Sequence, residues 1–152
     1  TDKPYRAVAG LSMGGGGSFL YALHPPELFS SACPLSADVG PLSLAATKDY
    51  LSRNRKEPLD LTDAEIEAFY KYRSTLALID AMPDAQKKAV RWYIDCGDDD
   101  FLYEGNSLVH IAMRKKEIPH EFRITDGGHN WTYWRKALPT VLSFVSDSFH
   151  QY

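Results

Sequence analysis

Cysteine is scarce in this sequence, which has only Cys33 and Cys96 among 152 residues. Two cysteines are too few for a disulfide framework. Each lies in an apolar run typical of a strand, so we expect both to be buried free thiols that say little about the compartment. The cysteines and histidines lack the C-x-x-C and H-x-x-x-H spacings of metal sites, so the sequence predicts no metal and no other cofactor.

Strong charge and long apolar runs are absent too. The net charge of -3 and the pI near 5.9 give no electrostatic basis for binding nucleic acid or anionic membranes. No apolar run approaches the roughly 20 residues of a membrane span. The first residues, TDKPYRAV, lack both a signal-peptide pattern and a start methionine, which indicates a processed or truncated end. We expect a secreted or periplasmic location in preference to a cytoplasmic one, and the oligomeric state stays open.

What is present suits one globular domain, because 44% of the residues are hydrophobic and 24% are charged. A helical excursion is predicted over 39–83, where Thr62 and Glu65 fit a capping box. Elsewhere strand-like runs alternate with amphipathic helical patterns, one of them over 105–118, which predicts a parallel α/β sheet with helices on both faces. Only four strands are visible, at 5–10, 30–38, 89–97 and 120–125.

The glycine-rich stretch GLSMGGGG, residues 10–17, allows several interpretations. A phosphate-binding cradle needs a Lys-Ser/Thr pair after the glycines, and Ser18 and Phe19 stand there instead. A dinucleotide fingerprint fails because the glycines are contiguous and Glu27 is too near. A flexible linker would not lie between an apolar strand and an amphipathic helix. The G-x-S-x-G pattern between a strand and a helix is typical of a nucleophile elbow that presents Ser12.

An elbow of this kind makes two local predictions. The turn is sharp, so Gly10 and Gly14 are expected where a β-carbon has no room. The helix that starts after Ser12 points unpaired backbone N–H groups and its positive dipole end at a developing oxyanion. The Met13 N–H is the expected first oxyanion donor.

The remaining parts of a serine hydrolase follow in the expected order. CGDDDFL comes after the third strand and offers Asp100, with Asp98 and Asp99 as rivals. DGGHNW comes after the fourth strand and offers His129. In hydrolases of this architecture the nucleophile, acid and base occur in this chain order, each beyond the carboxyl end of a strand. Surface or packing roles are expected for the other histidines, which are His24, His110, His120 and His150.

GLSMGG, IDCGDDDFL and GGHNWTYWR together resemble the putative-esterase family of α/β-hydrolases. That family includes S-formylglutathione hydrolases (esterase D), enterochelin esterases, tributyrin esterases, and feruloyl and acetyl-xylan esterases. The resemblance implies that Ser12 is the nucleophile, that Asp100, three residues after Gly97, is the acid, and that His129 is the base. Trp131 and Trp134 resemble the carbohydrate-esterase and tributyrin-esterase branches, and they are expected either to line the acyl or sugar pocket or to pack in the core.

The resemblance implies a serine carboxylesterase that works through an acyl-enzyme on acyl-sugars or plant polysaccharide esters. A thioesterase similar to S-formylglutathione hydrolase is the alternative, and an inactive fragment that acts as a binding piece is an alternative of another class. Domains of this family begin well before the elbow. Residues 1–152 are therefore expected to be a single partial α/β-hydrolase domain, the C-terminal half. Its missing N-terminal half would supply further strands and the second oxyanion donor.

Overall fold

A four-stranded parallel sheet forms the centre of the protein, whose computed structural model describes residues 2–150. The strands lie side by side in chain order, with β1 pairing only with β2 and β4 only with β3. All four predicted strands are present; the ends at Gly97 and Thr125 match, and the other ends are shifted by one to three residues. Their bounds are Ala7–Leu11 (β1), Ser31–Leu35 (β2), Arg91–Gly97 (β3) and Glu121–Thr125 (β4).

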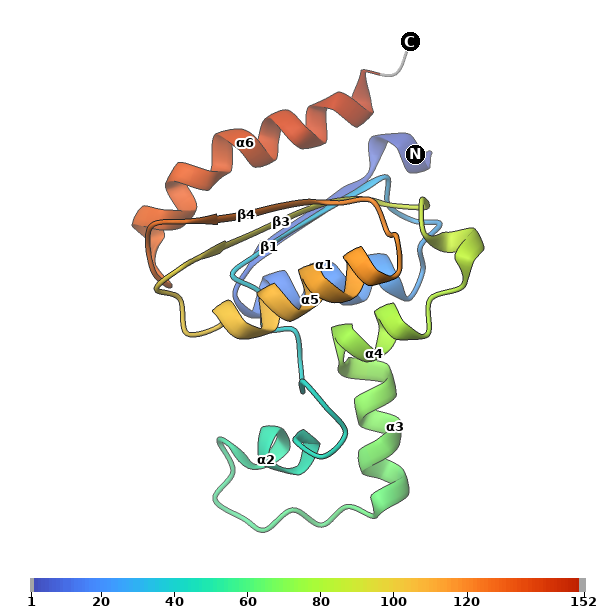
Figure 1. The fold of residues 1–152 in the computed structure, drawn as a ribbon, viewed down its shortest axis with the longest axis vertical. Helices are drawn as coiled ribbons and strands as arrows, with labels where there is room; N and C mark the ends of the chain where they lie inside the picture. The colour runs from blue at the N-terminus through green and yellow to red at the C-terminus, as the bar shows by residue number, and fades with distance from the viewer. Residues whose placement is uncertain (1, 151–152) are drawn as a thin grey trace.

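Helices cover both faces of the sheet, as the alternating pattern predicts (Figure 1). On one face lie α1 (Met13–Leu23) and α5 (Tyr103–Lys115), and on the other lies α6 (Trp131–Phe149). Two short 3-10 helices, Lys3–Tyr5 and Asp84–Gln86, precede β1 and β3 in the chain. Within residues 2–150, no helix is both long and apolar enough to cross a membrane.

The apolar core is divided into two layers by the sheet. The layer under α1 and α5 is centred on Phe19, Ile94, Val109 and Met113, all of them fully buried. The layer under α6 contains Cys33, Leu35, Tyr93, Tyr133, Trp134, Ala137, Val141 and Phe144. Cys33 and Cys96 are both free and fully buried, which confirms the expectation from the sequence.

The two buried thiols make stability sensitive to alkaline pH. Burial raises the pKa of Cys33 and the pKa of Cys96 from 9.0 to about 12 each. The unfolded chain therefore loses these protons near pH 9 while the folded chain keeps them, so folding is progressively disfavoured as the pH rises from 9 to 12. We expect each thiol to lower the unfolding free energy by about 1 kcal/mol between pH 9 and pH 10, because the thiol of the unfolded chain is only half ionised at pH 9. Urea denaturation at pH 9 to 10 measures this slope, and a Cys33→Ala protein with an unchanged slope would contradict it.

The excursion over 39–83 is helical, as predicted, and extends away from the sheet below α1 and α5 (Figure 1). It contains α2 (Thr47–Ser52), α3 (Asp63–Arg73) and α4 (Thr75–Asp80). The capping box of Thr62 and Glu65 begins α3, as the sequence indicates. A hydrogen bond connects the start of the excursion with the start of α4, because the Thr75 N–H donates to the Val39 carbonyl at 2.9 Å.

Candidate active site

Ser12 occupies a sharp bend between β1 and α1. Its backbone has φ 57° and ψ -119°, a left-handed conformation that is uncommon for a residue with a side chain. Hydrogen bonds hold this conformation in place. The Ser12 N–H donates to the Leu35 carbonyl at 2.9 Å, and the Ser12 carbonyl accepts from the N–H groups of Gly16 and Asp38 at 3.1 and 3.0 Å. The bend therefore presents the hydroxyl at the carboxyl end of the sheet.

The glycines of the bend are required at positions that differ in part from the predicted ones. A β-carbon on Gly10 would collide with the carbonyl group of Gly14, as expected. At Gly14 itself the expectation is wrong, because a β-carbon there would meet nothing within 4 Å. The crowded positions further along are Gly15, which faces the Leu35 carbonyl oxygen at 2.7 Å, and Gly16, which faces the carbonyl of Asp38. These two glycines let α1 pack closely against the chain that leaves β2.

This difference gives a matched pair of variants. We expect Gly10→Ala to lower the unfolding free energy by about 3 kcal/mol, because the new methyl group must displace backbone rather than a side chain. Gly14→Ala adds the same atom in open space on a helix, so it should raise the unfolding free energy by about 0.5–1 kcal/mol. Urea denaturation of both proteins measures the difference. Equal effects of the two substitutions would contradict the assignment of the crowded glycine.

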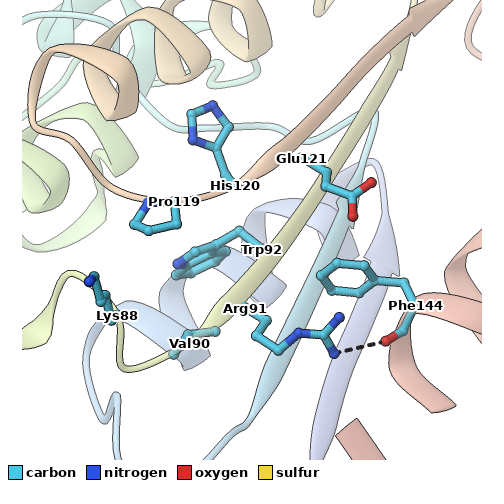
Figure 2. A pocket seen from close by; sticks show the side chains of 8 residues that line it. All are labelled: Lys88, Val90, Arg91, Trp92, Pro119, His120, Glu121 and Phe144. Carbon is cyan, nitrogen blue, oxygen red and sulfur yellow. Dashed lines mark hydrogen bonds between the residues drawn. The ribbon is translucent and has the colours of Figure 1, made fainter. Parts of the chain in front are cut away.

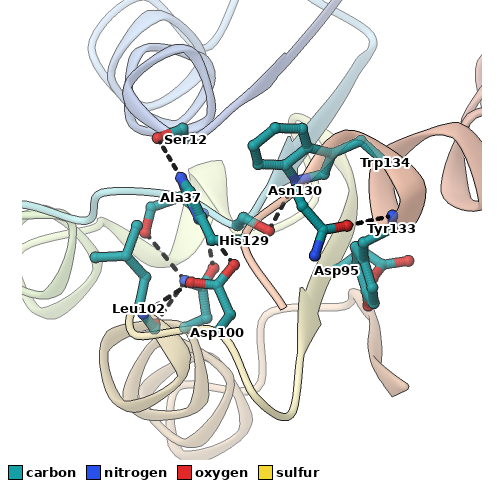
Figure 3. Close-up of polar contacts among 11 residues, drawn as sticks. Ser12, Ala37, Asp95, Asp100, Leu102, His129, Asn130, Tyr133 and Trp134 are labelled. Carbon is teal, nitrogen blue, oxygen red and sulfur yellow. Dashed lines mark hydrogen bonds and ion pairs between the residues drawn. The ribbon is translucent and has the colours of Figure 1, made fainter. Parts of the chain in front are cut away.

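His129 bridges Ser12 and Asp100. The His129 Nε2 lies 2.8 Å from the Ser12 Oγ, and the His129 Nδ1 lies 2.9 Å from the Asp100 Oδ2 (Figure 3). A carboxylate can only accept, so the Nδ1 donates to Asp100 and the Nε2 is left to accept from the serine hydroxyl. The structure thus brings together the three residues that the sequence singles out, which lie on three different loops.

Asp100 differs from its two acidic neighbours in burial and in partners. Its side chain is fully buried, and its second oxygen, Oδ1, accepts from the Leu102 N–H at 2.9 Å. Asp98 and Asp99 are both exposed, and the Asp98 carboxylate instead accepts from the Gly127 N–H at 3.0 Å. Asp98, Asp99 and Asp126 could together approach one cation, but an exposed acidic group of this kind is common without an ion. Of the three acids in the turn, Asp100 alone contacts His129.

A buried polar network connects the residues on either side of the His129 loop with β3. The Tyr133 hydroxyl donates to the Asp95 carboxylate on β3, which also accepts from the Tyr93 hydroxyl at 2.9 Å. The Thr125 hydroxyl donates to Tyr133 at 3.0 Å. A β-carbon on Gly127, where φ is 141°, would lie 2.6 Å from the Tyr133 ring. This network was not predicted, although an aspartate inside the apolar run of β3 was a signal that could have indicated it.

The environment of the imidazole is aromatic. Phe101 lies 4.7 Å from the His129 ring centre, and Trp134 meets it edge-on at 4.9 Å. Trp134 is buried and donates from its indole N–H to the Ser36 hydroxyl at 3.0 Å, whereas Trp131 is 60% exposed. Trp134 therefore packs in the core and against the histidine, whereas the exposed Trp131 meets the Trp134 ring edge-on at 5.3 Å and is not among the residues that line the cavity of Ser12. A substrate-binding role for either stays a prediction.

Other histidines, for which surface or packing roles are expected, make their contacts away from Ser12, Asp100 and His129. His110 and His120 hydrogen-bond to each other at 2.8 Å, and His24 bonds to the Tyr72 carbonyl at 2.8 Å. The Met13 N–H lies at the first turn of α1 and has no hydrogen-bond partner among residues 2–150. It is therefore available to a ligand beside Ser12, as the elbow pattern predicts.

Two open cavities compete as the binding site, and their positions decide between them. The first, of about 470 Å³, is lined by Ser12, Met13, Tyr50, Arg53, Phe101 and Leu102 among others. The second, of about 410 Å³, is lined by residues such as Arg91, Trp92 and Glu121 at the amino ends of β3 and β4 (Figure 2). That end of the sheet is opposite to the end that carries Ser12. Its one arginine, Arg91, already donates to the Phe144 carbonyl at 3.0 Å. Only the first cavity contains the serine hydroxyl.

The parallel sheet is covered by helices on both faces, and a strained serine follows β1. An acid and a histidine lie on loops further along the chain. Together these features define an α/β-hydrolase fold. The chain belongs to the family described as Putative esterase, which matches residues 1–145. The family membership predicted from the sequence is thereby confirmed.

Similar proteins agree with this assignment. A solved ferulic acid esterase is 33% identical, with a TM-score of 0.75 over 97% of this chain and 53% of its own. S-formylglutathione hydrolase (FrmB) from Staphylococcus aureus is 25% identical, with a TM-score of 0.71 over 95% of this chain and 55% of its own. An acetyl esterase from Caldicellulosiruptor saccharolyticus is 26% identical over 70 residues, which are 46% of this chain and 26% of that protein. The chain spans about half the length of these solved structures.

Proposed function

We propose that this chain carries the catalytic serine of a carboxylesterase that works through an acyl-enzyme. The observation that carries the proposal is the contact of His129 with both Ser12, at 2.8 Å, and Asp100, at 2.9 Å. The base is within hydrogen-bond distance of both the nucleophile and the orienting acid, which is the arrangement that activates a serine hydroxyl. Membership of an esterase family supports ester hydrolysis as the reaction.

The proposed reaction has two displacement steps. The Ser12 Oγ attacks the ester carbonyl carbon while the His129 Nε2 takes the hydroxyl proton, and the Met13 N–H donates to the oxyanion. His129 then protonates the departing alkoxide, and the acyl group stays on Ser12. Water attacks the acyl-enzyme with His129 again as base, which releases the carboxylic acid and restores the serine. Asp100 keeps the imidazole in the required tautomer and stabilises its cation.

We further propose that the second oxyanion donor comes from a segment of the protein that precedes this chain. The open edge of β1 supports this, because among residues 2–150 the strand that leads to Ser12 pairs with β2 alone. Additional strands on that edge would pair its free backbone groups. Loss of one oxyanion donor lowers kcat by about 10²–10³-fold in serine hydrolases. Residues 1–152 alone should therefore turn over slowly in comparison with a chain that includes such a segment.

Esters of acylated sugars or plant polysaccharides are the proposed substrates. The similarity to a ferulic acid esterase and an acetyl esterase supports this class. The exposed Trp131 supports it too, because its indole, packed against the Trp134 ring beside His129, offers an apolar face for stacking. The similarity to S-formylglutathione hydrolase supports small thioesters as the second candidate.

Active-site labelling tests the reaction type. We expect a fluorophosphonate probe to modify the chain stoichiometrically, with mass mapping that places the phosphonyl group on Ser12. Slow hydrolysis of 4-nitrophenyl acetate should accompany the labelling and stop once Ser12 is modified. A folded chain that is neither labelled nor active would contradict the proposal and favour the inactive binding piece.

A comparison of substrates tests the substrate class. We expect kcat/KM for feruloyl- and acetyl-xylooligosaccharides to exceed kcat/KM for S-formyl- and S-acetylglutathione. The experiment needs equal concentrations of active sites, which the fluorophosphonate titration supplies. The reverse order would reject the acyl-sugar assignment in favour of the thioesterase.

A further inference from the structure

The cavity that contains Ser12 has a basic far wall. This wall comes from the end of α2 and the residues after it, where Arg53 and Arg55 line the cavity on either side of Asn54. Ser12 and Met13 lie in the same cavity of about 470 Å³. A single small ligand can thus reach both the serine hydroxyl and the arginines, although 41 positions separate Ser12 from Arg53 in sequence and no motif connects them.

The charge of this wall is not neutralised within the protein. Among the side chains of residues 2–150, neither Arg53 nor Arg55 forms an ion pair or donates a hydrogen bond, and Arg53 only stacks over the Tyr50 ring at 5.4 Å. One carboxylate, Asp38, also lines the cavity. Its oxygens are occupied, because Oδ1 accepts from the Gly40 N–H at 3.0 Å and Oδ2 from the Tyr50 hydroxyl at 3.1 Å.

The same contacts fix the role of Tyr50 in this wall. Burial and the nearby Asp38 carboxylate raise the pKa of Tyr50, so the phenol stays protonated and keeps donating to Asp38. The cavity lining thus contains two guanidinium groups, of Arg53 and Arg55, and one carboxylate, of Asp38, so its net charge is positive. Leu51, Phe101 and Leu102 add apolar side chains to the lining of the same cavity. A cavity that combines a reactive serine, apolar side chains and a cationic wall suits a short carbon chain that ends in an anion.

We propose that Arg53 and Arg55 form a subsite for a carboxylate carried by the ester substrate a few bonds from the scissile carbonyl. This assignment rests on the proposed function of Ser12. The planar guanidinium group pairs with a carboxylate through two parallel N–H···O hydrogen bonds, so it fixes orientation as well as charge. Both side chains are exposed, so their hydrogen bonds to a carboxylate are expected to change binding by about 10-fold, near the lower end for a hydrogen bond to a charged group. The monoesters of short dicarboxylic acids have the required chemistry.

Matched charged and neutral esters test the subsite. The charged probes are the mono-4-nitrophenyl esters of succinate, glutarate and adipate, and the neutral probes are the same molecules with the free acid methylated. For the alcohol side, 4-carboxyphenyl acetate is compared with 4-carbamoylphenyl acetate. We expect kcat/KM to favour the charged member of at least one series by about 10-fold or more. Equal rates for charged and neutral probes in both series would overturn the proposal.

Variants assign the preference to the two arginines. Arg53→Gln and Arg55→Gln should each reduce the preference for the charged ester, measured within each protein as the ratio of kcat/KM for the charged ester to kcat/KM for its methylated counterpart, and the double variant should abolish that preference. Arg53→Lys should restore part of the preference without the bidentate geometry. Arg114→Gln, which removes an exposed charge near the end of α5, is the control that should change nothing. A preference that survives the double variant would overturn the proposal.

A binding measurement separates this proposal from the esterase assignment. Calorimetric titration of Ser12→Ala with monomethyl glutarate needs no turnover. Binding that weakens about 10-fold or more in the Arg53→Gln, Arg55→Gln background supports the subsite even if fluorophosphonate labelling has failed. Identical affinity with and without the arginines overturns the subsite and leaves the role of Ser12 to the labelling experiment.

Discussion

Ser12→Ala is expected to lower kcat/KM for 4-nitrophenyl acetate by about 10⁴-fold or more and to abolish fluorophosphonate labelling. The reason is that the alanine protein has no atom to carry the acyl group, although the rest of the site is intact. His129 keeps its contact with Asp100, so any residual rate comes from water activated by the imidazole and from the Met13 N–H. Steady-state kinetics and labelling of the same preparations give both readouts.

The control for this variant removes a hydroxyl elsewhere. Ser146 lies on α6 and donates only to the Ser143 carbonyl of its own helix, at 3.0 Å, so Ser146→Ala should retain full labelling and turnover. Unfolding free energies for both variants exclude loss of fold as the cause. Ser12 also has a positive φ, which alanine tolerates no better than serine. The unfolding free energy of Ser12→Ala should therefore be similar to that of the parent protein. An active Ser12→Ala protein would remove the basis of the proposed mechanism.

The parts of the site that could be predicted are those that local patterns encode. The strand before Ser12, the helix after it and the loops of Asp100 and His129 follow from short apolar runs and from glycines at their ends. Parallel strands bring their carboxyl ends to one edge of the sheet, so residues on these loops meet regardless of their separation in sequence. That rule is sufficient to predict the contact of His129 with Ser12 across 117 positions.

The choice among Asp98, Asp99 and Asp100 needed the structure. All three are acids in one turn, and the sequence preferred Asp100 only through the resemblance. What distinguishes it is a close approach of two loops. A β-carbon on Gly97 would collide with the Gly127 carbonyl, and the Asp99 N–H donates to that carbonyl at 3.0 Å. This contact brings the acidic turn against the histidine loop with Asp100 facing inward.

The cavity wall could not be predicted for a different reason. Arg53 and Arg55 belong to an excursion whose helices are set by local capping, but whose path depends on contacts between distant residues. In sequence, the run of charge at 53–57 is most simply a solvated surface. The structure confirms that residues 53–57 are exposed, and it also brings Arg53 and Arg55 to the cavity through the path of the excursion, in which the Ser74 hydroxyl donates to the Pro41 carbonyl at 2.8 Å. Such tertiary contacts leave no periodic pattern.

Asp100→Asn should lower kcat by about 10⁴-fold while leaving the fold and the binding of substrate nearly unchanged. An asparagine can still accept from the Leu102 N–H through its carbonyl oxygen, so its amide nitrogen faces the His129 Nδ1. That nitrogen is a donor, which favours the tautomer with a bare Nδ1 and a protonated Nε2. The Nε2 then donates to the Ser12 hydroxyl instead of accepting its proton, and the nucleophile is not activated.

The acidic turn supplies the matched control for this variant. Asp99→Asn makes the same chemical change one residue away at an exposed side chain, so its kcat should stay within about twofold of the parent. Asp98→Asn keeps an oxygen that can accept from the Gly127 N–H, and it should retain most of the activity for that reason. Kinetics on 4-nitrophenyl acetate for the three proteins decide between the acids. A large loss in Asp99→Asn with a small one in Asp100→Asn would instead assign the orienting role to Asp99 and would require a different geometry around His129 during the reaction.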